Sequence, residues 1–232
     1  MLNSKIDDKN IGLSKNLFWL RQQLDVYCLI AINADSINKK GIGKSFWAFL
    51  QKSCIDLIAL SICKIFECEK QNKQGKVKYE LNSIEGVLRY LVNEKPSALD
   101  SSRVCGFIRK YGHSPNKDAL LSGLSSTIAG FKEKYHKELE RFKTHRDKGV
   151  AHSEFKATHS ESEVNIGLPS YDVMERLFGF GADFYMLVSA AFISTASVSV
   201  VPCNLNSDRK VKVGLKRVLH ELGITDIKTE ME

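Results

Sequence analysis

The spacing of apolar side chains constrains this chain most, because over most of its 232 residues they recur at intervals of three and four. Such intervals place side chains on one face of an α-helix, whereas a half-buried strand needs alternation at every second position. The pattern predicts helices over the ranges 14–37, 45–69, 84–95, 118–151 and 170–197. We therefore expect an all-α fold in which the helix at 45–69, apolar on most sides, is central and buried.

Local signals set the expected ends of these helices. Four polar residues stand where a helix N-cap is expected: Ser45, Ser83, Asp118 and Ser170. Side chains of these types accept a backbone N–H group of the first turn, which has no partner within the helix. We also expect breaks at the glycine-containing run 39–43 and, within the fourth helix, at Gly130.

The composition is that of a globular protein. Apolar residues make up 43% of the chain and include 12 Phe, too many for a disordered protein. The six cysteines form no C-x-x-C pair, so we expect reduced thiols and a cytoplasmic location. The first residues, 1–8, lack the apolar stretch of a secretory signal.

One stretch, 184–202, carries no formal charge and approaches the length of a membrane span. Several serines and a threonine dilute it, so we expect a buried amphipathic helix and no membrane partner. We expect one helical domain over 1–202, followed by a basic C-terminal arm over 203–232 that is either an amphipathic helix or a mobile segment.

The formal net charge of +7 and the pI near 9.0 favour a polyanion such as RNA as a partner. The candidate RNA contacts are Arg141, Lys148, Arg209 and Lys210. Cations around the first two alternate with glutamates, as in ordinary charge pairing along a helix. The cluster at 209–217 is less compensated and is the better candidate, with a solvated basic face as the alternative.

Two common patterns for binding a cofactor are not met. The run 38–45 resembles the end of a phosphate-binding loop, but Asn38 stands where that loop needs its first glycine. His145, His152 and His159 would align on a helix, yet neighbours two turns apart are separated by about 10.5 Å, too far for a shared metal. We therefore expect neither a metal nor another cofactor.

The segment RFKTHRDKGVAH, residues 141–152, carries the residue types that RNA cleavage needs. The Arg146 guanidinium can bind a phosphate through two parallel hydrogen bonds and stabilise the charge that grows on it. A histidine titrates near neutral pH, so His152 can move the proton of a ribose 2′-hydroxyl or of the leaving 5′-oxygen. Without a metal, the pattern indicates transesterification of RNA.

The alternative is a surface helix on which Arg146 pairs with Asp147 and His152 has no role. Six residues along an ideal helix leave the side chains of Arg146 and His152 about 120° apart. They converge only if the helix ends near Gly149 or if a second subunit completes the site.

The run from Arg146 to His152, preceded by a long helix, resembles the Arg-x(4–6)-His signature of the HEPN superfamily, including the polar residue directly after the arginine. The upstream segment 46–67 resembles the second helix of the AbiU-like abortive-infection branch. The resemblance implies a compact helical bundle that forms homodimers. It also implies a metal-independent endoribonuclease of a defence or toxin–antitoxin system, although other members only bind RNA or nucleotides.

Carried over to these positions, the resemblance makes His152 the general acid or base, Arg146 the phosphate clamp and Asp147 a polar helper. Asp56 is the one acid in an otherwise apolar run, and Cys63 and Glu67 share its helical face. A carboxylate there needs a partner or a wet cleft. We expect Asp56 either to form a structural buried pair, for which Arg146 is the candidate, or to line the same cleft.

The sequence thus predicts an RNA-cleaving helical protein. The competing hypothesis is a helical module that binds RNA or protein without cutting. A third is one half of a toxin–antitoxin pair, in which residues 203–232 dock an antitoxin or another defence protein.

Overall fold

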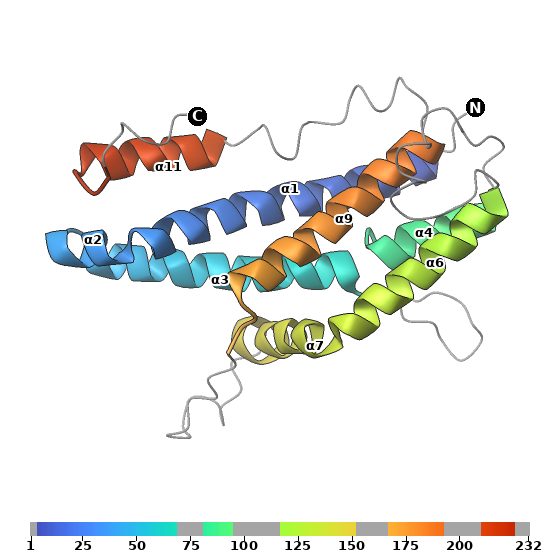
Figure 1. The fold of residues 1–232 in the computed structure, drawn as a ribbon, viewed down its shortest axis with the longest axis horizontal. Helices are drawn as coiled ribbons and strands as arrows, with labels where there is room; N and C mark the ends of the chain where they lie inside the picture. Colours follow the sequence, from blue (N-terminus) through green and yellow to red (C-terminus); the bar gives the residue numbers. More distant parts are fainter. Residues whose placement is uncertain (1–3, 69–80, 95–116, 152–166, 193–209, 226–232) are drawn as a thin grey trace.

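The computed structural model describes residues 4–68, 81–94, 117–151, 167–192 and 210–225, and within these ranges the chain is helical and has no strand (Figure 1). The helices are α1 (Ser4–Ile32), α2 (Ala34–Lys40), α3 (Lys44–Phe66), α4 (Ile84–Glu94), α6 (Lys117–Lys134), α7 (His136–Thr144), α9 (Tyr171–Phe192) and α11 (Lys210–Glu221). A π-helix, η1 (His145–Ala151), follows α7 directly. The predicted all-α fold is confirmed.

The long helices α1 and α3 form the centre of the bundle. α1 contributes a fully buried stripe with the predicted spacing: Leu13, Leu17, Leu20 and Leu24. α3 meets this stripe with Ile58, Ile62 and Ile65, which are equally enclosed. Each such side chain contributes about 1.5–3 kcal/mol through the removal of apolar surface from water. α9 lies across α1, and α7 packs along α3 (Figure 1).

Two glycines shape the turn between α2 and α3. Gly41 (φ 71°) ends α2 and Gly43 (φ 64°) precedes α3, both in the left-handed region that glycine adopts without steric cost. The break predicted at 39–43 is therefore confirmed. The prediction that Ser45 caps the next helix is wrong, because Gly43 occupies the cap position and Ser45 lies within the first turn.

Two of the other predicted caps precede their helices. The Ser83 hydroxyl accepts the amide N–H of Gly86 at 3.1 Å, as expected at the start of α4. Ser170 directly precedes α9, and its carbonyl accepts the first amides of that helix. Asp118 is not a cap, because α6 begins at Lys117. The Asp118 carboxylate lies in the first turn of α6, where a negative charge interacts favourably with the helix dipole.

The predicted interruption at Gly130 is wrong, because α6 passes through this glycine. Glycine costs a helix only about 1 kcal/mol relative to alanine, and the packing of neighbouring Ile128 and Phe131 into the core outweighs that cost. The break comes at Tyr135, whose backbone (φ −107°, ψ 21°) leaves the helical region. The buried Tyr135 ring lies 4.6 Å from that of Phe131, centroid to centroid.

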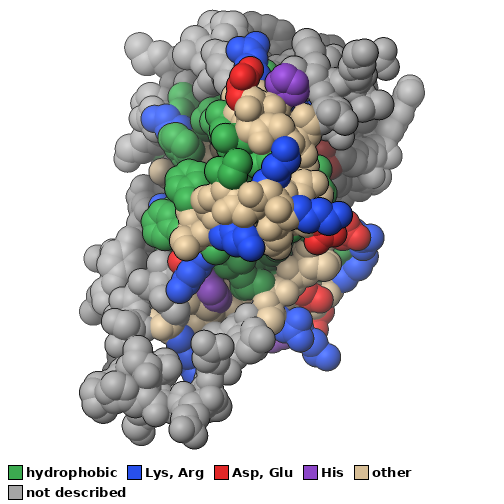
Figure 2. All heavy atoms as spheres, turned by 90° about the vertical axis from the view of Figure 1, so that its left-hand side faces the viewer, with side chains coloured by type: hydrophobic (Ala, Val, Ile, Leu, Met, Phe, Trp, Pro, Cys, Tyr) green, Lys and Arg blue, Asp and Glu red, His purple; other side chains and the backbone are tan. Residues whose placement is uncertain are grey.

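α3 is buried over its second half and exposed near its start. Phe46 is 58% exposed and Phe49 69%, so the prediction that this helix is buried on most sides holds only from about Cys54 onward. Figure 2 views this end of the molecule and shows hydrophobic side chains gathered beside Lys and Arg. By length and composition alone α3 meets the criterion for a membrane span, but core helices meet it too, and 39% of the window is buried.

The end of α9 agrees with the buried helix predicted for 184–202. Tyr185, Leu187 and Val188 belong to the core, whereas residues beyond 192 lie outside the described part. α11 is a helix whose fully buried Leu219 joins a second apolar cluster with Leu29 of α1. The predicted domain boundary at 202 also lies outside the described residues.

An ion-pair network ties α1 to α9. The guanidinium of Arg21 lies 2.6 Å from Asp25 and 2.8 Å from Glu175, and the Tyr171 hydroxyl bonds to Glu175. Arg21 and Asp25 are almost completely buried, so their charges depend on each other. Removal of one partner from a buried pair is costly because the remaining charge has lost its compensation.

We expect Arg21→Ala to lower the free energy of unfolding by about 3–5 kcal/mol. Urea denaturation followed by circular dichroism measures this change. The matched control is Lys15→Ala, an exposed cation on the same helix, which should change stability by less than about 0.5 kcal/mol. Equal stability of the two variants would contradict the structural role of the network.

Candidate functional site

The segment that carries the predicted Arg–His motif is held against α3 at two points. His145 Nε2 lies 2.8 Å from Asp56 Oδ1, and Arg146 Nη1 lies 3.3 Å from Glu67 Oε2. Asp56 lies in α3 and Glu67 is the C-cap residue of that helix; the eleven residues between these positions are close to three helical turns, so both carboxylates lie on the same side of the helix axis. The segment itself is the π-helix η1, a rare conformation that is found frequently at functional sites.

Arg146 is oriented by carboxylates on both sides of its guanidinium. Its Nε donates to Asp147 Oδ1 at 2.7 Å, while Nη1 faces Glu67. The hydrogen bond that Arg146 donates to Asp147 and the charge of Glu67 raise the pKa of Arg146, so this group stays cationic at any physiological pH. Its side chain is 20% exposed, which leaves part of the guanidinium accessible from solvent.

Asp147 therefore contacts the arginine that it was predicted to help. The predicted partner of Asp56, however, is wrong: Asp56 pairs with His145, and Glu67 is the α3 carboxylate that pairs with Arg146. Asp56 is also 30% exposed rather than buried. The sequence placed both carboxylates on one face of α3, but it could not show which of them η1 would meet at each position.

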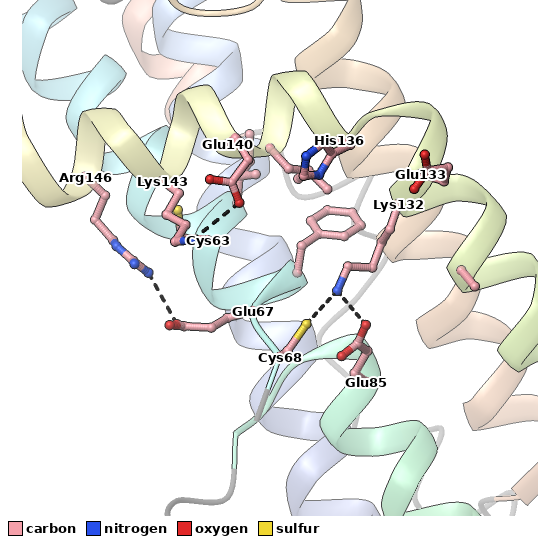
Figure 3. Close-up of a pocket in the computed structure, with 14 residues that line it drawn as sticks. Cys63, Glu67, Cys68, Glu85, Lys132, Glu133, His136, Glu140, Lys143 and Arg146 are labelled. Atoms are coloured by element: carbon pink, nitrogen blue, oxygen red, sulfur yellow. Dashed lines mark hydrogen bonds and ion pairs between the residues drawn. The ribbon is translucent and has the colours of Figure 1, made fainter. Parts of the chain in front are cut away.

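An open cavity of about 490 Å³ lies beside Arg146, between α3, α4, α6 and α7. Its apolar lining includes Ile62, Phe66 and Leu139. Its polar rim consists of Glu67, Glu85, Lys132, Glu133, His136, Glu140, Lys143 and Arg146 (Figure 3). Arg146 and Lys143 lie at one end, and Lys132 lies at the other with Cys68 and Glu85.

The Lys132 end of the cavity is held by contacts of its own. The Lys132 ammonium lies 2.5 Å from Glu85 Oε1 and 2.8 Å from Cys68 Sγ. These contacts raise the pKa of Lys132 against the opposing effect of burial, so the cation is kept. The cavity therefore presents a positive group at each end.

The cavity was missed in the sequence, although a signal for it was present. Lys132, His136, Leu139, Lys143 and Arg146 are spaced by four, three, four and three residues, as on one helical face. The charges among them also fit ordinary pairing along a solvated helix. When basic side chains recur at intervals of three and four residues beside a buried apolar face, they indicate a polar surface that faces another helix of the fold.

The structure does not bring the remaining predicted site residues into this cavity. Arg141 and Lys148 are exposed and are not among its lining residues. His152 and Arg209 lie outside the described residues, and of Lys210 only its place at the start of α11 is described. α11 packs on α1, whereas α7 packs on α3, on the other side of the bundle in Figure 1.

The helix that carries the motif runs through Gly149 to Ala151, as far as the sequence predicts. His152 lies outside the described residues, so its approach to Arg146 stays a prediction. No group of three or more His, Cys, Asp or Glu side chains is placed to hold a metal ion within the described ranges.

The described helices form a bundle that holds an arginine, on a π-helix, at the edge of a cavity. A family model, HEPN_AbiU2 (AbiU2), matches residues 4–210. The chain therefore belongs to the HEPN AbiU2 family, an abortive-infection defence domain, as the resemblance in the sequence predicted. No curated protein and no solved structure matches the chain.

Cys63 lines the cavity next to Arg146, yet its surroundings make it a poor nucleophile. Burial raises the pKa of Cys63 to about 11, and burial does the same for Cys54. From the ordinary value of 9.0, such a shift lowers the thiolate fraction near neutral pH about a hundredfold.

We therefore expect iodoacetamide to alkylate Cys63 and Cys54 at least about a hundredfold more slowly in the folded protein than in urea, since the thiolate is the reactive form. Peptide mass spectrometry over a time course near pH 8 measures both rates. Rapid labelling of Cys63 in the folded protein would show that the cavity supports a reactive thiolate.

Proposed function

We propose that this protein is a metal-independent endoribonuclease of an abortive-infection defence system, with Arg146 and His152 as its catalytic residues. The observation that carries the proposal is the position of Arg146: a partly exposed guanidinium, oriented by Asp147 and Glu67, at the mouth of a cavity that holds a cation at each end. Family membership supports it, because many HEPN proteins are RNases.

In the proposed reaction, the ribose 2′-oxygen attacks the adjacent phosphorus. The new O2′–P bond forms as the P–O5′ bond breaks, which yields a 2′,3′-cyclic phosphate and a 5′-hydroxyl. The 2′-hydroxyl loses a proton and the leaving 5′-oxygen gains one, and His152 supplies one of these transfers. The Arg146 guanidinium stabilises the charge on the phosphoryl oxygens in the transition state.

A homodimer accounts for the second proton transfer. Six residues along a helix leave the side chains of Arg146 and His152 in one chain about 120° apart, so one chain does not readily bring them together. A second copy would bring its own His152 to the cleft, so that one histidine accepts the proton and the other donates it. The RNA contacts proposed for Arg141, Lys148, Arg209 and Lys210 would guide the strand to this cleft through its phosphates.

Arg146→Ala should lower the single-turnover rate of RNA cleavage about 10²–10³-fold, because it removes a preorganised group from the transition state. His152→Ala should lower it by about 10²–10⁴-fold through the loss of proton transfer. Purified protein is incubated with total cellular RNA in excess EDTA, and cleavage is followed on denaturing gels.

Arg141→Ala is the matched control for Arg146, since both are cations of the same helical segment and Arg141 is exposed. As a phosphate contact, Arg141 should affect RNA affinity and leave the rate at saturating protein unchanged. His220→Ala on α11 is the histidine control. Cleavage that survives Arg146→Ala and His152→Ala, or that disappears in EDTA, would refute the proposed mechanism.

A second function is favoured by one observation. Arg146 is already paired with two carboxylates, which is also how an arginine with a purely structural role is held. In that case the protein binds RNA, or binds a partner defence protein through residues 203–232, and does not cleave RNA. RNA that stays intact in the presence of folded protein, bound with a steep dependence on salt, would support this alternative.

A further inference from the structure

The cavity beside Arg146 has the size and lining of a site for one nucleotide of the proposed RNA substrate. Its volume of about 490 Å³ falls within the range of small-molecule pockets. The apolar lining of Ile62, Phe66 and Leu139 offers a surface for a flat, weakly hydrated ring. The exposed imidazole of His136 on the rim is a side chain on which an unpaired base stacks.

The cations of the rim match the phosphates of an RNA strand. Every internal nucleotide has a phosphate on each side, and the cavity has Lys143 and Arg146 at one end and Lys132 at the other (Figure 3). Each end cation is now balanced by a carboxylate, Glu67 at Arg146 and Glu85 at Lys132. These carboxylates orient the cations in the absence of a ligand. A phosphate, which offers two accessible oxygens, can compete with the carboxylates for the same cations.

Glu140 is the carboxylate best placed to contact the base. Glu67 and Glu85 are held by Arg146 and Lys132, whereas the Glu140 carboxylate is 51% exposed and, among the described residues, makes only a long 3.4 Å contact with Lys143. In Figure 3, Glu140 lies between the Arg146 end of the cavity and His136. An ionised carboxylate only accepts hydrogen bonds, so it favours an exocyclic amino group over the N3–H of uracil, which lies between two carbonyl oxygens that repel the carboxylate.

We propose that this cavity is the base-specificity pocket of the RNA site, in which Glu140 accepts a hydrogen bond from the exocyclic amino group of a nucleotide beside the cut. The pocket would then select adenine, cytosine or guanine over uracil, which has no exocyclic amino group. This inference rests on the proposed function for its place beside the scissile phosphate, but the binding preference itself does not require cleavage.

The experiment has two arms. In the first, cuts are mapped by sequencing on an RNA that contains every dinucleotide, and uridine at one fixed position beside the cut should be disfavoured about tenfold. In the second, the affinities of cytidine and uridine 5′-monophosphates are measured by NMR titration, and the cytidine nucleotide should bind more tightly by a similar factor.

Glu140→Gln should reduce both preferences to less than about twofold, because an amide donates to uracil as readily as it accepts from an amino group. Glu138→Gln is the matched control, a glutamate on the same helix that does not line the cavity, and it should keep both preferences. Ala129→Phe, which fills the cavity from an exposed position on α6, should abolish nucleotide binding, whereas Ser126→Phe nearby should not.

The outcomes separate the two proposals. Cleavage without base preference, or a preference that Glu140→Gln leaves unchanged, overturns the base-specificity pocket and leaves the nuclease intact. If the cytidine nucleotide binds more tightly, this preference depends on Glu140, and RNA is left uncut, the result supports the proposed base-specificity pocket and overturns the proposed nuclease activity. Equal affinities of the two nucleotides in the parent protein also overturn the pocket.

Discussion

The contact between η1 and α3 determines where the arginine of the motif lies. Two carboxylates on one face of α3, Asp56 and Glu67, each meet one of two consecutive η1 side chains, His145 and Arg146. Partly exposed pairs of this kind contribute little to stability, in general about 0–1 kcal/mol each. Their role is therefore one of orientation: the buried core supplies the stability, and these pairs set the direction in which the guanidinium points.

The core makes this arrangement rigid. α3 is fixed on one side by the leucine stripe of α1, and on its other side it receives α7 and η1. Phe142 of α7 is fully buried, and Phe66 near the end of α3 stacks on Phe131 of α6. The polar cavity lies immediately next to this aromatic packing, so the walls that carry its charged side chains have little freedom to move. Such preorganisation is what transition-state stabilisation by fixed charges requires.

The sequence predicted the features that depend on local spacing, namely the helices and their buried faces, and it missed the features that depend on contacts between distant parts of the chain. The leucines of α1 and the cap at Ser83 follow from local spacing, and both are observed. Gly130 did not break its helix, because its packed neighbours outweigh a small local cost. The pairing of Asp56 with His145 was not predictable, since residues 89 positions apart meet only when α7 docks on α3. The family, by contrast, was predicted from the resemblance of two segments, 46–67 and 146–152, and the family model confirms it.

The most direct test of the central claim is the chemistry of the RNA ends that the purified protein produces in excess EDTA. Attack by the neighbouring 2′-hydroxyl must leave a 2′,3′-cyclic phosphate on one fragment and a 5′-hydroxyl on the other, and mass spectrometry of a short defined RNA identifies both ends. Transesterification predicts these ends, with no incorporation of ¹⁸O from labelled water into the cyclic phosphate. A 5′-phosphate with a 3′-hydroxyl, or an uncut RNA, would contradict it.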